Sequence, residues 1–254
     1  MTSQTDLSAT RVEWLASIDS TNDEAMRRAR DGVRAPIWIA AREQTKGRGR
    51  QGRAWQSPQG NLAASLLLID PAPMALAPQL GFVTGVALAQ AAKDLLPALV
   101  SAQLKWPNDL VAKGAKLSGL LLEAAQMADG HLACVIGIGL NIESHPENLP
   151  YAATCLRELG SEARVELALE RIRAHMSVWL SRWQRGENFA AIREAWMGHA
   201  AGLDARIKVQ MSGETKIGIF RGLDAAGQMI LETEKGRETI AAGDVFLDQQ
   251  QEIR

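Results

Sequence analysis

The chain has 254 residues, of which 46% are hydrophobic and 22% are charged, and its net charge is −1. This length allows one large core and a small second domain. The composition excludes disordered, collagen-like and membrane-spanning classes, since apolar runs such as Leu62 to Ile69 are too short to cross a bilayer. The polar residues 1–10 lack the apolar core of a signal peptide, so a cytoplasmic location is expected.

Cysteine and histidine offer no clear catalytic or metal centre. The two cysteines, Cys134 and Cys155, cannot staple a scaffold and are expected to be ordinary reduced thiols. The four histidines have no metal-ligand spacing with one another or with cysteine, so no zinc site is expected. A near-neutral chain also argues against a dedicated nucleic-acid binder, which needs a strongly positive surface.

The first predicted element is a helix that ends near Arg30, before Asp31-Gly32. Either Ser20 or Thr21 can be its N-cap, with an acidic residue closing a capping box. A short strand is predicted over residues 37–41. Residues 44–53 contain three glycines and no apolar residue, and this composition predicts a loop.

The middle of the chain alternates apolar strands with longer helical patterns. Strands are predicted over residues 61–69, 102–106, 117–124 and 132–138, and helices over residues 80–96, 162–183 and 188–201. Lys113-Gly114 and Asp129-Gly130 are turn signals between strands. The expected fold is therefore α+β, with a mixed, largely antiparallel sheet and helices packed on one side.

The pattern changes after Leu203. Short strands are predicted over residues 207–211, 216–223, 229–234 and 238–241, each separated from the next by a turn with glycine. Such a segment predicts a small SH3-like β-barrel. The chain is thus expected to contain a catalytic domain over residues 1–203 and a small C-terminal β domain over residues 204–254.

The loop between the first two predicted strands carries the clearest chemical signal. Residues 42–53 contain five cations and one anion, interleaved with three glycines. Glycine lets the backbone approach a ligand closely, and arginine offers a planar fork for carboxylate or phosphate. The pattern indicates an anion site, although a solvated basic loop or a short RNA-binding segment has a similar composition.

Three further motifs place polar residues at strand ends. Lys105-Trp106-Pro107-Asn108-Asp109 closes a strand, Lys116-Leu117-Ser118-Gly119 opens the next, and Gly137-x-Gly139-x-Asn141 ends a buried strand. Taken singly, each has an ordinary explanation as a turn, a solvated lysine or a small-residue strand end. Together with the loop they provide cations for an anionic ligand.

The ordered set of motifs resembles the biotin–protein ligase family. The resemblance rests on Ser20-Thr21-Asn22, on Gln44-x-x-Gly47-Arg48-Gly49-Arg50-x-Gly52-Arg53-x-Trp55 and on the three strand-end motifs, and spans about residues 14–248. It implies an enzyme that joins biotin to ATP, releases pyrophosphate and holds biotinyl-5′-AMP. Biotin then passes to a lysine of a biotin carboxyl carrier domain, such as that of acetyl-CoA carboxylase.

The resemblance also assigns roles to individual residues. Biotin would be bound by Ser20, Thr21, Asn22, Gln44, Arg48, Gly49, Arg50, Lys116 and Gly119. ATP would be bound by Arg48, Arg50, Trp55, Lys105, Asn108, Lys116 and Asn141, although Trp55 has an equal alternative as a core residue. Lys116, Arg50 and Lys105 would be the catalytic cations, and Asp109 the ligand of Mg²⁺.

Three other functions are alternatives to a biotin–protein ligase. A transcriptional regulator would need a DNA-binding domain, and the roughly nineteen residues before Ser20 are too few for a helix-turn-helix, so no DNA binding is expected. A lipoate or octanoyl transferase shares the broad fold but has a different loop. A biotin-storage protein would not need the cations Lys105 and Lys116.

Two further features are hypotheses about motion and assembly. The glycine-arginine loop and the segment 143–151 are expected to close over the reactive adenylate, because a mixed anhydride must be kept from water. An exposed edge strand would allow a homodimer. The sequence does not identify the carrier protein.

Overall fold

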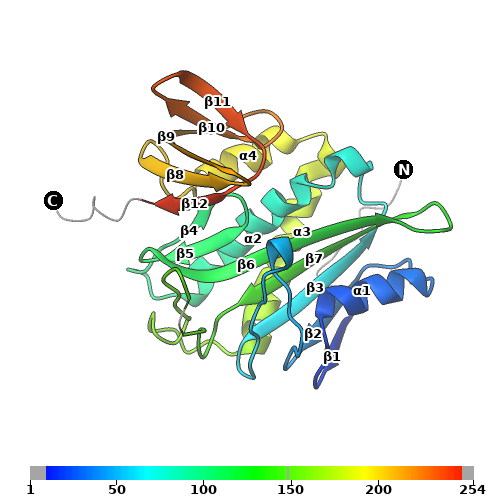
Figure 1. The fold of residues 1–254 in the computed structure, drawn as a ribbon. Helices are drawn as coiled ribbons and strands as arrows, with labels where there is room; N and C mark the ends of the chain where they lie inside the picture. Colours follow the sequence, from blue (N-terminus) through cyan, green and yellow to red (C-terminus); the bar gives the residue numbers. More distant parts are fainter. Residues whose placement is uncertain (1–9, 148, 248–254) are drawn as a thin grey trace.

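The computed structural model describes residues 10–147 and 149–247 and contains a large sheet, a small sheet and helices (Figure 1). The large sheet has seven strands, and only its first pair, β1 with β2, is parallel. This confirms the predicted mixed, largely antiparallel sheet. In spatial order its strands are β1 (Val12–Leu15), β2 (Ile37–Ala41), β3 (Leu62–Ile69), β7 (Leu132–Leu140), β6 (Ala115–Gln126), β5 (Asp109–Ala112) and β4 (Ala102–Lys105).

The helices cover both faces of this sheet. Helices α2 (Gln79–Leu95), α3 (Val165–Trp183) and α4 (Phe189–Met197) share one core with Trp38, Leu66 and Ile136. Helix α1 (Thr21–Arg30) packs instead against Ile39 and Leu67, the neighbours of Trp38 and Leu66 along their strands. Because successive strand residues point to opposite faces, α1 lies on the other side of the sheet.

The placement of α1 corrects the expectation that all helices pack on one side. The central strands are apolar at nearly every position rather than at every second one, and β2, β3 and β7 are buried almost throughout. Strands of that composition need cover on both faces. Helix α1 covers only part of the second face and leaves the rest to a loop.

Helix α2 is the most apolar helix of the fold. The stretch Met74–Leu95 is long and apolar enough to cross a membrane, but a helix of this kind is also typical of a protein core. Here Leu80, Val83 and Val86 are fully buried in the main core. Pro97 follows the end of the helix, as predicted.

The predicted C-terminal β domain is a five-stranded antiparallel sheet. Its strands are β8 (Arg206–Met211), β9 (Glu214–Leu223), β10 (Met229–Thr233), β11 (Gly236–Ile240) and β12 (Asp244–Leu247), in the order β11-β10-β9-β8-β12. Val209, Phe220 and Met229 belong to the same apolar core as α2 and the large sheet. The division at residue 203 falls in a turn, and the core continues across it.

Three strands were not predicted, namely β1, β5 and β12. Each has only four residues, so its periodicity is too short to distinguish from a loop. Pairing with a longer neighbour makes each of them a strand, as β2 does for β1 and β8 does for β12. These short strands matter because β5 and β12 each begin with an aspartate beside the pocket described below.

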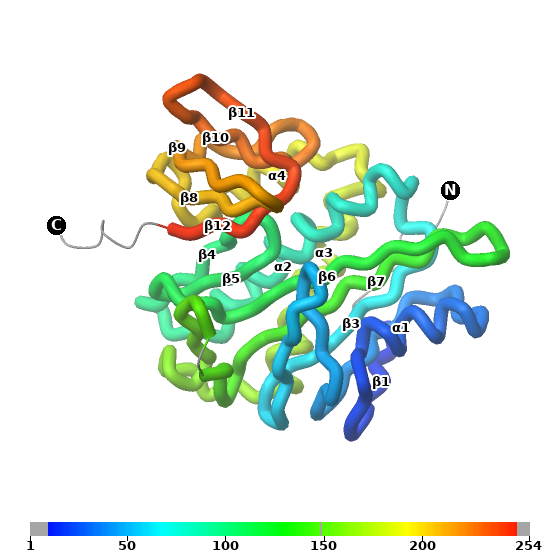
Figure 2. The backbone as a smooth tube through the Cα atoms, viewed as in Figure 1, coloured from blue at the N-terminus to red at the C-terminus, as the bar shows by residue number. Residues whose placement is uncertain are grey.

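The connection between β2 and β3 crosses the face of the large sheet that α1 leaves open. Figure 2 shows it running from β2 toward the C-terminal sheet and back to β3. It contains a short 3-10 turn at Arg50–Gly52, with Gln51 in the left-handed region at φ 56°. We call residues 44–55 the Gly-Arg loop.

Candidate active site

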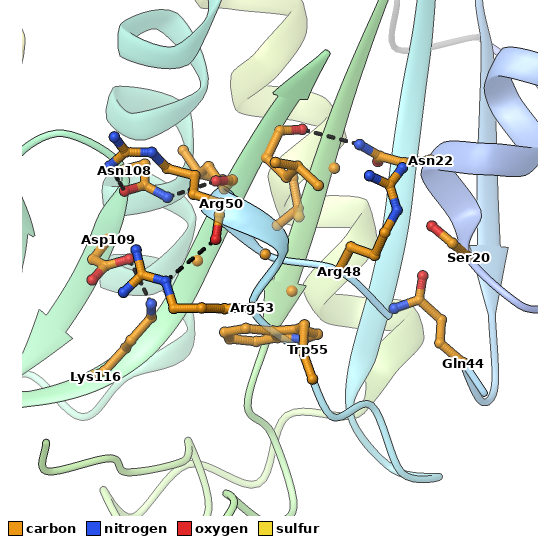
Figure 3. A pocket seen from close by; sticks show the side chains of 18 of the residues that line it. Ser20, Asn22, Gln44, Arg48, Arg50, Arg53, Trp55, Asn108, Asp109 and Lys116 are labelled. Carbon is orange, nitrogen blue, oxygen red and sulfur yellow. Dashed lines mark hydrogen bonds and ion pairs between the residues drawn. The ribbon is translucent and has the colours of Figure 1, made fainter. Parts of the chain in front are cut away.

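A pocket lies between the Gly-Arg loop, α1 and the open face of the large sheet. Its empty volume is about 710 Å³, including space open to solvent. Figure 3 shows Ser20, Asn22 and Gln44 on one side of it and Asn108, Asp109 and Lys116 on the other, with Trp55 between. The lining residues are Ser20, Thr21, Asn22, Gln44, Arg48, Gly49, Arg50, Arg53, Ala54, Trp55, Asn108, Asp109, Lys116, Gly119, Leu120, Leu121, Gly137, Ile138, Gly139, Tyr151 and Asp244.

The structure brings most of the predicted site residues together in this pocket. Lys105 and Asn141 are the two that do not line it. Lys105 lies behind Asp109, whose Oδ2 is 3.3 Å from the lysine Nζ. Asn141 is buried at the end of β7, where its side-chain amide donates to the carbonyl of Thr154 at 3.0 Å and its Oδ1 has no partner among the described residues.

Glycines form the floor of the pocket on β6 and β7. A Cβ on Gly139 would lie 2.2 Å from the Trp55 indole, and one on Gly119 would lie 3.1 Å from the same ring. A Cβ on Gly137 would lie 2.2 Å from Oδ1 of Asn22. The missing side chains let Trp55 and Asn22 lie directly on the sheet. Trp55 therefore both packs on the sheet and lines the pocket.

The end of the pocket at the start of α1, here called the α1 end, presents mainly neutral hydrogen-bonding groups beside the ion pairs of Arg48. Ser20 is the N-cap, and its Oγ accepts from the backbone N–H of Asp23 at 3.3 Å. Oε1 of Gln44 accepts from the backbone N–H of Thr21 at 2.8 Å and lies 3.0 Å from the Thr21 hydroxyl oxygen. Gln44 in turn donates to Ser57 at 3.2 Å. These bonds tie the beginning of α1 to the Gly-Arg loop.

The cationic end is organised around Asp109. Its Oδ1 is 2.7 Å from Nζ of Lys116 and its Oδ2 is 3.3 Å from Nζ of Lys105. The Lys116 ammonium also lies 5.6 Å from the ring centroid of Trp55 and 5.4 Å from that of Tyr151. Two aromatic rings and a carboxylate thus hold one lysine at the start of β6.

The arginines of the Gly-Arg loop contact three separate parts of the fold. Arg48 pairs with Asp23 of α1 at 2.5 Å and with Glu123 of β6 at 3.0 Å. Arg50 donates to Oδ1 of Asn108 at 3.0 Å. Arg53 pairs with Asp244 of β12 at 2.9 Å. The loop is therefore anchored at both ends of the pocket and to the C-terminal sheet.

These contacts shift the pKa values of the three arginines in different directions. The hydrogen bonds that Arg48 donates to Asp23 and Arg53 donates to Asp244 raise the pKa of these two arginines. Burial lowers the pKa of Arg50, because its guanidinium has no carboxylate hydrogen-bonded to it and loses hydration. Arg50 is thus the least compensated of the three charges and the one best placed to gain from an anionic ligand.

Sequence reasoning missed several lining residues. Arg53 was recognised as part of the loop but not as a site residue, and Tyr151 only as part of a covering segment. Asp244 lies 191 positions along the chain from Arg53, its partner in the loop, and no local pattern marked it. Leu120, Leu121 and Ile138 are apolar strand residues, which gave no signal beyond strand formation.

A metal centre made by protein side chains is not evident in the part of the chain that the structure describes. No group of three or more His, Cys, Asp or Glu residues there could hold an ion. Both oxygens of Asp109, the predicted Mg²⁺ ligand, accept from lysine ammonium groups. Cys134 and Cys155 are both buried free thiols, as expected.

Comparison with known proteins identifies the family of this chain. Residues 14–141 match the Biotin/lipoate A/B protein ligase family, and residues 202–248 match the Biotin protein ligase C terminal domain. The biotin–[acetyl-CoA-carboxylase] ligase of Paracoccus denitrificans is 36% identical over 91% of this chain and 98% of its own length. The chain belongs to the biotin protein ligase family.

Two further family members show the range of this resemblance. A biotin protein ligase from Aquifex aeolicus, solved in complex with biotin and ATP, has a TM-score of 0.79 and 29% identity, covering 94% of this chain and 98% of that one. The bifunctional ligase/repressor BirA of Bacillus subtilis is 29% identical over 91% of this chain and 72% of its own length. The chain is accordingly a biotin ligase with the family's catalytic fold and its C-terminal sheet.

The glycine floor provides the first test of the site. Gly139→Ala should raise the KM for biotin and lower stability by about 1–3 kcal/mol, because the new Cβ overlaps the indole of Trp55. Both are measured by ligase kinetics and urea unfolding. Gly81→Ala is the control, since a Cβ there meets nothing within 4 Å and favours the helix. An unchanged KM in Gly139→Ala would contradict the role of Trp55.

Proposed function

We propose that this enzyme activates biotin with ATP to biotinyl-5′-AMP and then transfers biotin to one lysine of a biotin carboxyl carrier protein. The observation that carries the proposal is the division of one pocket into two chemistries. Ser20, Thr21 and Gln44 offer hydrogen bonds at one end, and Lys116 lies among cations at the other. A ligand with a polar uncharged ring and a carboxylate fits such a pocket.

In the first step the biotin carboxylate attacks the α-phosphorus of ATP, and the bond to pyrophosphate breaks. Two anions must meet, and at 4 Å their repulsion is roughly 1 kcal/mol in water and about 4 kcal/mol in a partly shielded site. The step needs cations and no general base, since the carboxylate is already ionised at pH 7. The required cations are Lys116, Lys105 and Arg50, and the step uses no histidine or cysteine nucleophile.

Lys116 is the proposed principal catalytic cation. Its backbone is fixed at the start of β6, where its N–H donates to Ala152 and its C=O accepts from Thr154. Its ammonium pairs with the carboxylate of Asp109. A ligand carboxylate or phosphoryl oxygen can replace Asp109 as its partner, while Lys105 remains to neutralise the aspartate.

The proposed adenine end is near Asn141. The Oδ1 atom of this residue is a buried acceptor without a partner in the described part of the chain, which is costly unless a donor reaches it. The exocyclic amine of adenine is such a donor. Asn141 lies behind residues 152–156, since its Nδ2 donates to Thr154 and its C=O accepts from Leu156. We therefore expect that segment to shift when the nucleotide binds.

Mg²⁺ is expected to accompany the ATP phosphates, with Asp109 as its predicted ligand. The residues present do not fit a metal site as they stand. Both Asp109 oxygens are engaged by lysines, and the described part of the chain contains no cluster of potential ligands. No step of the mechanism is routed through the metal.

The second step is attack of the carrier lysine amine on the acyl carbon of the adenylate. An amide bond forms, the acyl–phosphate bond breaks and AMP leaves. The adenylate must stay bound until the carrier arrives. Arg50 and Arg53 extend over the cationic end from the Gly-Arg loop, and Asn61 anchors the proposed covering segment by accepting from the N–H groups of residues 142–144.

The absence of DNA binding, a cytoplasmic location and a homodimer remain predictions. The relevant relatives include both ligases and bifunctional ligase/repressors. Specific binding of a biotin-operon operator in a gel shift would contradict the first of these. Strand β1 is an edge strand of the large sheet and is one place where a second copy could pair.

The central claim predicts a mass change on a carrier. A biotin carboxyl carrier domain incubated with the enzyme, ATP, Mg²⁺ and biotin should gain the mass of one biotin, measured by mass spectrometry. The same mixture without ATP, or with lipoate in place of biotin, should leave the mass unchanged. Gain from lipoate but not biotin would refute the proposal.

Lys116→Ala should slow adenylate formation by about 10²–10³-fold, because one donor aimed at the developing charge is removed. The measurement is biotin-dependent exchange of pyrophosphate into ATP. Lys93→Ala, which removes an exposed lysine of α2 away from the pocket, is the matched control. A rate within a few-fold of the wild-type rate would refute the role of Lys116.

Arg50→Gly should shorten the lifetime of the enzyme–adenylate complex, because the least compensated cation of the loop is lost. The lifetime is measured by gel filtration of the complex formed with labelled biotin. Arg185→Gly serves as the control, since Arg185 lies outside the pocket lining and its φ of 56° suits glycine. Equal lifetimes in wild type and Arg50→Gly would contradict this prediction.

A further inference from the structure

A continuous chain of hydrogen bonds crosses the α1 end of the pocket. It begins at Gln44, whose Oε1 accepts from the backbone N–H of Thr21. The Thr21 hydroxyl then donates to Ser65 and the Ser65 hydroxyl to Asn22, and the chain continues through Glu123 to Arg48. Ser65 and Glu123 do not line the pocket. They connect four lining residues and can act on a ligand only through them.

The orientation of the Asn22 amide is fixed within this chain. Its Nδ2 donates to Oε2 of Glu123 at 2.8 Å and to the carbonyl of Leu121 at 3.2 Å, which uses both of its hydrogens. Its Oδ1 accepts from the hydroxyl of Ser65 at 2.6 Å. An amide oxygen has two lone pairs, so Oδ1 alone keeps capacity for a further bond. Asn22 can therefore accept from a ligand but cannot donate to it.

Glu123 decides that orientation. If the amide of Asn22 turned over, Oδ1 would face the Glu123 carboxylate and the Leu121 carbonyl, and three acceptors would meet without a hydrogen. The same carboxylate lies 3.0 Å from the guanidinium of Arg48, so the loop and the amide share one anchor. Asn22 has no room to move away, since it lies directly against Gly137 and is almost fully buried.

We propose that Glu123 is a positioning residue that makes this end of the pocket selective for a ring carrying N–H donors. The inference rests on the proposed function, since the ureido ring of biotin has two such donors. A 1,2-dithiolane ring of the lipoate type has none. Glu123 reaches the ligand through Asn22 and Arg48, so its loss should weaken ring recognition more than it slows the chemical step at Lys116.

Glu123→Gln tests this directly, because the glutamine amide can donate to Oδ1 of Asn22 and favour the inverted orientation. The KM for biotin should rise about tenfold or more, as for a lost bond to a charged group, with a much smaller change in kcat and in the KM for ATP. Pyrophosphate exchange gives all three values. Glu232→Gln is the matched control, since Glu232 pairs with Arg221 far from this pocket.

A second variant separates positioning from a loss of folding. Asn22→Asp together with Glu123→Gln exchanges carboxylate and amide across the same hydrogen bond and keeps the net charge. The glutamine introduced at position 123 would then donate to the aspartate introduced at position 22, whose other oxygen again presents an acceptor to the ligand. The Leu121 carbonyl loses its donor in this variant. The double variant should therefore recover part of the loss, with a biotin KM below that of either single variant and above that of wild type.

A biotin analogue methylated on one ureido nitrogen tests whether Glu123 acts on ring recognition. The ratio of the KM for this analogue to the KM for biotin would not change if Glu123 only supported the fold. Wild type should reject the analogue more strongly than Glu123→Gln does. An unchanged biotin KM in Glu123→Gln, or additive losses in the double variant, would overturn the proposal. Wild-type enzyme without biotin-dependent exchange would instead refute the proposed function itself.

Discussion

The close approach of side chains to a bare strand surface is the constraint on which the site depends. β6 and β7 are adjacent strands, and they place Gly119, Gly137 and Gly139 on the face that α1 only partly covers. A single methyl group at Gly137 or Gly139 would overlap Asn22 or Trp55. The pocket exists because the sheet carries no side chains at these three positions, and residues at both ends of the pocket rest on that floor.

Charge compensation is the second feature that organises the site. Arg48, Arg53 and Lys116 each have a carboxylate partner on an element other than their own. This arrangement holds the cations in place, and in the proposed mechanism an anionic ligand replaces the carboxylates. Arg50 is the exception, with an amide partner and a pKa lowered by burial. The site therefore combines three cations that are paired with carboxylates and one, Arg50, whose charge is poorly compensated.

The small sheet is also part of the site. Asp244 opens β12 and lines the pocket through its pair with Arg53, and the indole of Trp106 donates to the carbonyl of Gly227. A shared apolar core continues from α2 into β9 and β10. The C-terminal sheet is thus packed so that the Gly-Arg loop contacts it.

The sequence by itself determined the fold class, the longer helices and strands and the Gly-Arg loop, and its resemblance to a known family pointed to most of the residues that meet in the pocket. The elements and the loop are local properties, since periodicity, capping and glycine-rich turns depend on neighbouring residues. Only the tertiary structure decided that α1 lies on the opposite face from the other helices, and that Glu123, Ser65, Tyr151 and Asp244 join the site. Such contacts depend on strand order and register, which bring together residues far apart in the chain and which no local pattern encodes.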